Sequence, residues 1–151
     1  MGNDNIFMKL FMLLPEDNAE KLWLHTIKKY VEEGGSLSAT YSKNGWTLLH
    51  YASENLFSDV VKMLLCNGSE VNSKAENGST PYLVALDSSI DFAIQYGEPE
   101  INFSLVKTLI EHGANVDACS SDGISRKTIL EAYGTKASDA YYEVIKNIKE
   151  D

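Results

Sequence analysis

The hydrophobic positions of this chain recur with the spacing of amphipathic helices. Within 60–65 the apolar residues stand at i, i+1, i+4 and i+5, which places them on one helical stripe. A matching stripe follows at 105–110, and a looser one predicts a capping helix near 140–149. The run 6–14 is almost entirely apolar, which predicts a buried first helix.

The chain also repeats itself. Residues 44–52 align with residues 77–85 at an offset of 33, with Asn, Gly, Thr and Ala coinciding. Residues 60–72 align with residues 105–117 at an offset of 45, so the later copy holds 12 extra residues (45 minus 33). A fainter copy covers 27–37. Self-similarity near this period indicates one supersecondary unit stacked several times.

Each copy carries the local signals of a turn followed by two helices. The Asn-Gly pair favours a tight turn with positive φ. Thr47 and Thr80 then stand where a helix N-cap is needed, and Pro81 fits a first helical turn that needs no N–H. Gly68 and Gly113 fall where the residue after the second helix must be left-handed.

These residues resemble the ankyrin repeat, whose pattern is a turn with Gly-x-Thr-Pro-Leu-His-x-Ala and then Val-x-x-Leu-Leu-x-x-Gly-Ala-x-Val-Asn. The resemblance implies an all-α solenoid of about four helix-turn-helix units, with turns that project toward a concave binding face. It is close in the two central units and loose in the caps. The expected divisions of a single domain, 1–151, are an N-terminal cap (5–41), a repeat (42–74), a repeat with the insert (75–119) and a C-terminal cap (120–151).

Two departures from the family pattern stand out. The 12-residue insert falls within 86–100, where it either lengthens the first helix of its repeat or forms a loop closed at Gly97 and Pro99. The last repeat keeps its turn around Gly123 but loses Pro-Leu-His, so we expect a degenerate cap.

Composition narrows the class of protein. The chain has 151 residues, 44 % of them apolar, which is enough for one core. Its 22 acidic against 13 basic residues give a net charge of −9, which argues against nucleic acid as a partner. Cys66 and Cys119 lack partners at disulfide or zinc spacing and predict half-buried thiols in a reducing compartment. The N-terminal run lacks the charge order of a signal peptide and is shorter than the roughly 20 residues that span a bilayer, so we expect a soluble, cytoplasmic protein.

The three histidines do not predict catalysis. The resemblance implies that His50 hydrogen-bonds backbone in the neighbouring turn, and His112 lies at a helix end. His25 has no Cys, Asp or Glu at ligand spacing. Nucleophile-elbow, phosphate-loop, dinucleotide and His-Glu-x-x-His motifs are all missing. We therefore predict a non-enzyme without catalytic residues, cofactor or metal.

The positions free to bind a partner are those that packing does not fix. In the repeat these are the turn tips and the exposed side of each first helix. The candidates at the turns are Lys43, Asn44, Trp46, Glu76, Asn77, Ser79, Ser121, Asp122 and Ile124, and those on the helices are Glu54, Asn55, Asp87 and Ser88.

Two apolar features near these positions each allow two interpretations. Trp46 at a turn tip is either a partly exposed interface residue or folds back on the adjacent turn or on Tyr41. Leu56 and Phe57 stand where the family more often has Gly-His, and they either pack under the insert or are exposed.

Charge indicates the class of partner. The insert carries Asp87, Asp91, Glu98 and Glu100, and with Glu54 and Glu76 these predict an acidic patch that steers a basic protein. The alternative is ordinary solubilising charge. We predict a protein-binding module that, like the immunity-type and viral-decoy ankyrin proteins it resembles, inhibits one basic partner in a 1:1 complex. The alternative function is an adaptor or scaffold that bridges partners.

Overall fold

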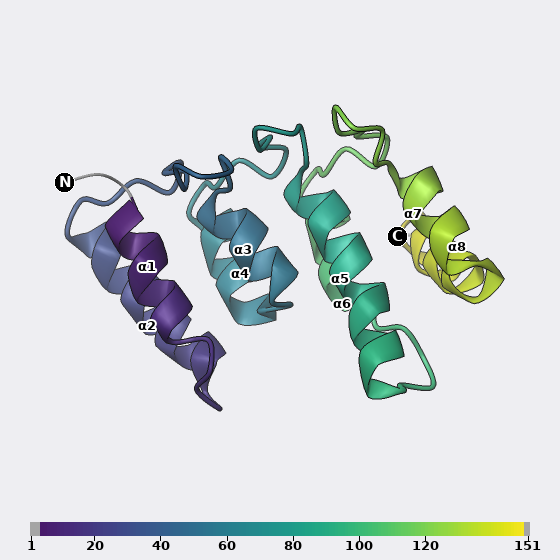
Figure 1. The fold of residues 1–151 in the computed structure, drawn as a ribbon, viewed down its shortest axis with the longest axis horizontal. Coiled ribbons are helices and arrows are strands. Elements are labelled where there is room, and N and C mark those ends of the chain that lie inside the picture. The colour runs from purple at the N-terminus through teal and green to yellow at the C-terminus, as the bar shows by residue number, and fades with distance from the viewer. Residues whose placement is uncertain (1–3, 150–151) are drawn as a thin grey trace.

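The computed structural model describes residues 4–149, which form helices stacked in two layers. The front layer in Figure 1 contains the first helix of each pair, and the second helices lie behind it. The pairs are α1 (Asp4–Met12) with α2 (Ala19–Glu32), α3 (Leu48–Glu54) with α4 (Ser58–Cys66), α5 (Pro81–Tyr96) with α6 (Ser104–Glu111), and α7 (Arg126–Tyr133) with α8 (Thr135–Lys149). Over this range no strand forms, so the all-α ankyrin-type solenoid predicted from the sequence is confirmed.

The predicted caps hold the starts of the front helices. The Thr47 hydroxyl accepts a hydrogen bond from the His50 backbone N–H at 3.4 Å, and Thr80 accepts one from Leu83 at 3.4 Å. In the degenerate last unit Ser125 takes this role and forms a capping box with Thr128. Loss of Pro-Leu-His therefore leaves the start of α7 intact.

Backbone hydrogen bonds join each turn to the next. The Glu76 N–H donates to the Asn44 carbonyl at 3.1 Å, and the Ser121 N–H donates to the Asn77 carbonyl at 2.8 Å. Gly45 and Gly78, each with positive φ, sit at these junctions. A Cβ on Gly45 would lie 3.0 Å from the Glu76 backbone nitrogen, so the close approach of the turns favours glycine there.

The insert lengthens a helix. α5 has 16 residues against 7 in α3, and it ends at Gly97 in the left-handed conformation with φ +64°. The helical alternative for the insert is therefore correct, and its extra turns reach beyond the end of α3 (Figure 1).

Three local expectations need correction. The C-terminal helix starts at Thr135, five residues before the predicted 140, and it buries Tyr141 while Tyr142 is 55 % exposed. α1 is amphipathic rather than buried all round, because Met8 and Met12 are exposed. Both cysteine thiols belong to exposed residues, not half-buried ones, since each follows or precedes a turn.

One cluster of buried side chains extends from Ile6 in α1 to Tyr141 in α8. At its C-terminal end the buried hydroxyls of Tyr82 and Tyr141 share a hydrogen bond of 2.6 Å, which joins α5 to α8. Burial and this hydrogen bond raise the pKa of Tyr82. The Arg126 guanidinium lies 5.9 Å from the centre of the Tyr141 ring.

Candidate binding surface

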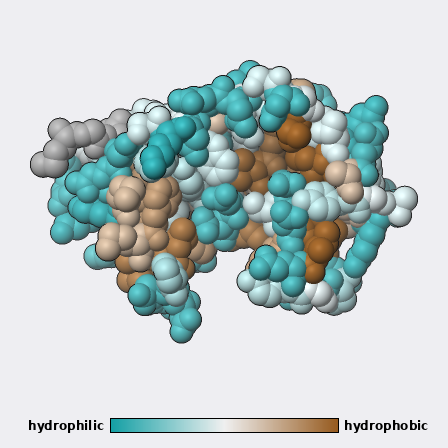
Figure 2. Space-filling model, viewed as in Figure 1, coloured by the Kyte–Doolittle hydropathy of each residue, from teal (hydrophilic) through white to brown (hydrophobic). Residues whose placement is uncertain are grey.

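A groove on the front layer brings together predicted binding residues from different repeat units. It has a volume of about 390 Å³ and runs across α3, α5 and α7. Six of the predicted residues line it: Trp46, Glu54, Ser79, Asp87, Ser88 and Ile124. We call it the α3–α5–α7 groove, and its remaining lining residues are Leu83, Val84, Thr128, Ile129, Ala132 and Tyr133. Figure 2 shows hydrophobic residues gathered on this side of the molecule around α5 and α7.

Trp46 is half-buried and forms one end of the groove. Its ring lies 5.6 Å from the His50 ring in a stacked arrangement and 4.9 Å from the Tyr51 ring. The side chain therefore folds back on its own helix α3, while the Tyr41 backbone N–H donates to the Trp46 backbone carbonyl at 2.8 Å. The packing partner is thus α3 rather than the adjacent turn or the Tyr41 ring, and the half-buried ring also lines the groove, where its contact with a partner stays a prediction.

His50 is buried and structural, as the resemblance implied. Its Nδ1 accepts a hydrogen bond from the Thr47 backbone N–H at 3.2 Å, and its Nε2–H donates to the Ser79 carbonyl at 2.9 Å. Burial lowers the pKa of His50 to about 4, so the ring is neutral at pH 7. With both nitrogens in use, the ring joins α3 to the next turn.

Two carboxylates of α5 converge on a tyrosine of α7. The Tyr133 hydroxyl lies 3.1 Å from an oxygen of Asp87 and 2.5 Å from one of Asp91. Burial raises the pKa of Asp87, and the Tyr133 hydrogen bond partly offsets that rise. Burial and both carboxylates raise the pKa of Tyr133, so this hydroxyl stays protonated as a donor. The Tyr133 hydroxyl thereby holds the carboxylate of Asp87, which lines the groove, in position.

The predicted acidic residues do not form one patch. Glu54 and Asp87 line the α3–α5–α7 groove, and partial desolvation raises the pKa of Glu54. Glu98 and Glu100 lie beyond the end of α5 and line a separate hollow of about 480 Å³, together with Asn55. The reason is helical geometry: positions 87 and 91 share a face of α5, whereas positions 98 and 100 follow its last turn.

The remaining predicted residues form the turns. Asn44 donates to the Tyr51 hydroxyl at 2.9 Å and accepts from the Trp46 N–H, so its side chain is occupied within the protein. Asn77 likewise accepts from the Ser79 N–H at 3.0 Å, and Asp122 accepts from the Ser120 hydroxyl. Lys43 and Glu76 are exposed at the tips, outside the groove lining.

Sequence reasoning missed Tyr133 and the apolar floor of the groove. Tyr133 lies at the end of the degenerate last unit, more than 40 positions from the two carboxylates it bonds. Leu83 and Ile129 looked like core positions, which they also are. Ile124, 42 % exposed, was recognised as a turn tip, and an exposed isoleucine at that position was the available signal.

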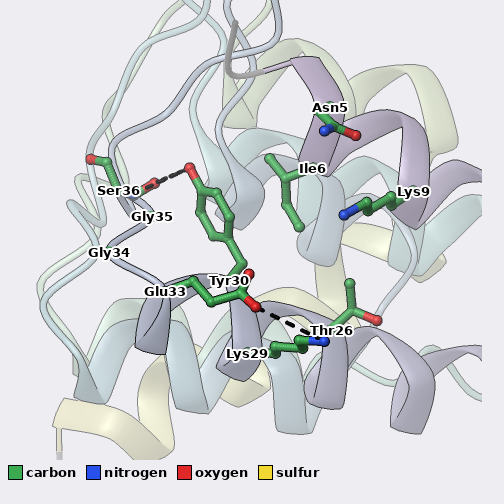
Figure 3. A pocket seen from close by; sticks show the side chains of 10 residues that line it. All are labelled: Asn5, Ile6, Lys9, Thr26, Lys29, Tyr30, Glu33, Gly34, Gly35 and Ser36. Atoms are coloured by element: carbon green, nitrogen blue, oxygen red, sulfur yellow. Dashed lines mark hydrogen bonds and ion pairs between the residues drawn. The ribbon is translucent and has the colours of Figure 1, made fainter. Parts of the chain in front are cut away.

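A larger hollow at the N-terminal end contains none of the predicted residues. It measures about 720 Å³ and lies between α1, α2 and the following turn (Figure 3). Lys29 pairs with Glu33 at 3.9 Å, and Tyr30 exchanges hydrogen bonds with Ser36. Its charged groups are partly satisfied by one another, which makes it a weaker binding candidate than the groove.

Fold and surface together define a repeat solenoid of stacked helix pairs. Residues 44–76 match the family model named Ankyrin repeat, which identifies the second unit as an ankyrin repeat. Over 59 residues the chain is 32 % identical to the 2-5A-dependent ribonuclease of Mus musculus and 30 % identical to that of Homo sapiens. This stretch is 39 % of the present chain and 8 % of each ribonuclease. The comparison therefore does not assign ribonuclease activity to this chain.

Within residues 4–149, His, Cys, Asp and Glu do not form a group of three or more arranged to hold a metal ion. Over the same span, every helix is too short or too polar to cross a membrane.

Proposed function

We propose that this ankyrin protein is an inhibitor-type binding module that occupies a functional surface of a basic partner protein through the α3–α5–α7 groove. An ankyrin repeat indicates a protein-interaction module. The proposal that this module inhibits a basic partner rests on the groove. The observation that carries it is the convergence of residues from three helix pairs on one hollow with an apolar floor and an acidic rim.

The chemistry of the groove favours a basic partner. Glu54 and Asp87 line it, whereas its lining holds no Lys, Arg or His. Trp46 and Ile124 add apolar surface of the kind that anchors interfaces. A net charge of −9 adds long-range attraction that speeds association with a basic protein in a salt-sensitive way.

Further parts of the proposal concern the whole chain. We propose a single domain over 1–151 that binds its partner 1:1 in the cytoplasm, supported by one buried cluster from Ile6 to Tyr141 and by two free, exposed cysteines. We assign it no catalytic role, since the buried His50 uses both ring nitrogens in structural hydrogen bonds.

The test begins with co-purification from the native host and mass spectrometry at low and high salt. We expect one stoichiometric basic protein, released by salt. The double variant Glu54→Gln/Asp87→Asn then weakens binding about tenfold and reduces its salt dependence. The control Asp139→Asn/Glu143→Gln removes the same charge from exposed positions on α8 and leaves affinity nearly unchanged.

Ile124→Ser tests the apolar part of the groove separately. This side chain is 42 % exposed and outside the buried cluster, so we expect weaker binding without loss of stability. An acidic partner indifferent to salt, or equal affinity of the groove and control variants, would refute the inhibitor proposal.

The alternative function is an adaptor that bridges two proteins. It requires a second surface, and the separate hollow lined by Glu98 and Glu100 is the observation that favours it. Under this alternative, co-purification returns two partners that bind at once, with only one of them sensitive to Glu54→Gln/Asp87→Asn.

A further inference from the structure

The overhanging end of α5 creates a recess that is separate from the α3–α5–α7 groove. Because α5 is nine residues longer than α3 (16 minus 7), it extends about 13 Å past its neighbour at 1.5 Å per residue. Figure 2 shows a notch at the lower edge of the molecule, beside this end of α5. The α5 recess is lined by Asn55, Leu56, Phe92, Glu98, Glu100 and Asn102 among others, and it shares no lining residue with the groove.

The exposed aromatic ring of Phe92 lines the recess, and Tyr96 lies beside it on α5. Phe92 is 47 % exposed and Tyr96 is 63 % exposed, and their rings lie 4.6 Å apart at i, i+4 on α5. This pair lies on the extension, outside the buried cluster. An exposed aromatic pair beside a hollow is the kind of apolar surface that interfaces use.

Leu56 forms the opposite wall in an unfavourable backbone conformation. Its φ is +55°, the left-handed region in which a branched side chain is disfavoured and glycine is favoured. The turn itself ends α3, because the Phe57 N–H donates to the Ala52 carbonyl at 3.0 Å. A leucine at this position keeps an apolar side chain facing the recess, where glycine would leave none.

The polar groups of the recess select the charge of the ligand. Glu98 and Glu100 both line it, and its lining contains no Lys, Arg or His. Neither carboxylate takes part in an ion pair with any residue in the described range 4–149. The Asn102 side-chain oxygen already accepts from the Ser104 N–H at 2.9 Å, and the Asn55 amide donates to the Tyr51 carbonyl. The carboxylates are thus the groups left to pair with a cation.

We propose that the α5 recess binds a short basic–apolar peptide segment of a partner protein. An apolar side chain of that segment packs between Leu56 and Phe92, and a neighbouring Arg or Lys pairs with Glu98 and Glu100. An arginine also stacks on the Phe92–Tyr96 pair. A second copy of this chain is a poor occupant, because each copy carries a net charge of −9.

This site stands independently of the proposed inhibitor function. The two surfaces have no lining residue in common, so a ligand confined to one leaves the lining of the other uncovered. Occupation of the recess by a second segment of the same partner would raise the apparent affinity through effective concentration.

The experiment selects a library of random linear peptides on the full-length chain and removes clones that also bind Glu98→Gln/Glu100→Gln. The expected clones carry Arg or Lys next to a large apolar residue. Enrichment of acidic or uncharged sequences overturns the proposal, and so does the absence of clones that depend on the two carboxylates.

The strongest selected peptide is then titrated into the isotope-labelled chain and followed by backbone amide chemical shifts. We expect shifts confined to residues near Leu56, Phe92 and 98–102. Affinity falls about tenfold in Glu98→Gln/Glu100→Gln and in Phe92→Ser. It is unchanged in the control Asp139→Asn/Glu143→Gln and in Glu54→Gln/Asp87→Asn, which alters only the groove. Shifts centred on Trp46 and Asp87, or equal affinity of all variants, refute the site.

Discussion

The helices α3 and α5 begin alike and end differently. Each starts at a threonine N-cap after an Asn-Gly turn. Six of the seven α3 residues are buried, whereas α5 is buried in its first half and exposed large apolar residues lie near its end. The comparison shows that the cap and neighbouring turn position a repeat helix, while the added length of α5 packs on one side through Ile90 and leaves Phe92, Ile94 and Tyr96 exposed. The extension therefore adds new surface on the side of α5 that faces away from the core.

The largest expected effect is on the free energy of unfolding, and it differs between the two halves of α5. Leu86 is fully buried, so Leu86→Ala should lower the free energy of unfolding by about 2–5 kcal/mol. Ile94 is 63 % exposed, so Ile94→Ala should change it by less than about 0.5 kcal/mol. Urea unfolding measures both. A large loss for Ile94→Ala would show that the extension is part of the packed framework.

The next prediction concerns the start of α3 and depends on pH. The pKa of His50 is lowered to about 4, so the unfolded chain takes up a proton near pH 6.5 while the folded chain does not. The neutral ring therefore stabilises the fold fully above about pH 6.5, and this contribution declines as pH falls toward 4. We expect a loss of about 3 kcal/mol between pH 7 and pH 4 from this residue.

The variant His50→Gln isolates that contribution. Other acidic groups also titrate in this interval, so the informative quantity is the difference in pH slope between the parent chain and the variant. Urea midpoints at several pH values provide it. Parallel slopes would contradict a neutral, buried His50.

The start of α5 depends on a different contact. Tyr82→Phe removes one of two buried hydroxyls and leaves that of Tyr141 without its partner, which should cost about 1–3 kcal/mol. The double variant Tyr82→Phe/Tyr141→Phe should cost less than the sum of the single variants, because no unpaired hydroxyl remains. Additive losses, measured by urea unfolding, would mean that the hydrogen bond contributes little.

The smallest effect concerns the far end of α5. Gly97 has φ +64° and open space where a Cβ would lie, so Gly97→Ala incurs only the backbone penalty, about 1 kcal/mol. Gln95→Ala, at an exposed helical position, serves as the control and should be close to neutral. Thermal unfolding compares the two. Equal midpoints would indicate that α5 does not need its left-handed end.

Local patterns in the sequence predicted much of this fold. The caps at Thr47 and Thr80 and the left-handed Gly68 and Gly113 depend on neighbours only a few positions away. The state of the insert stayed open because both a helix and a loop can end at Gly97. Its helical outcome depends on packing of residues such as Ile90 against the rest of the core, which periodicity alone does not reveal.

The binding surface was predicted less completely. Six candidates converge as expected from repeat geometry, namely Trp46, Glu54, Ser79, Asp87, Ser88 and Ile124. The role of Tyr133 could not be predicted, because its partners are distant in sequence. The acids at 87–100 looked like one patch because they are close along the chain, but the end of α5 separates them into two surfaces. The prediction that each surface binds protein stays to be tested by the variants above.

The hydrogen bonds between neighbouring turns allow the cooperativity of unfolding to be measured at individual backbone amides. The amides of Glu76 and Ser121 each donate across a seam between units, so their protons exchange with solvent only when that seam opens. Equal exchange rates at the two amides mean that the stack opens as one body. A faster rate at Ser121 means that the last unit detaches first, as nearest-neighbour coupling allows in a repeat array. Two backbone protons therefore distinguish a single folding unit from a chain of separable ones.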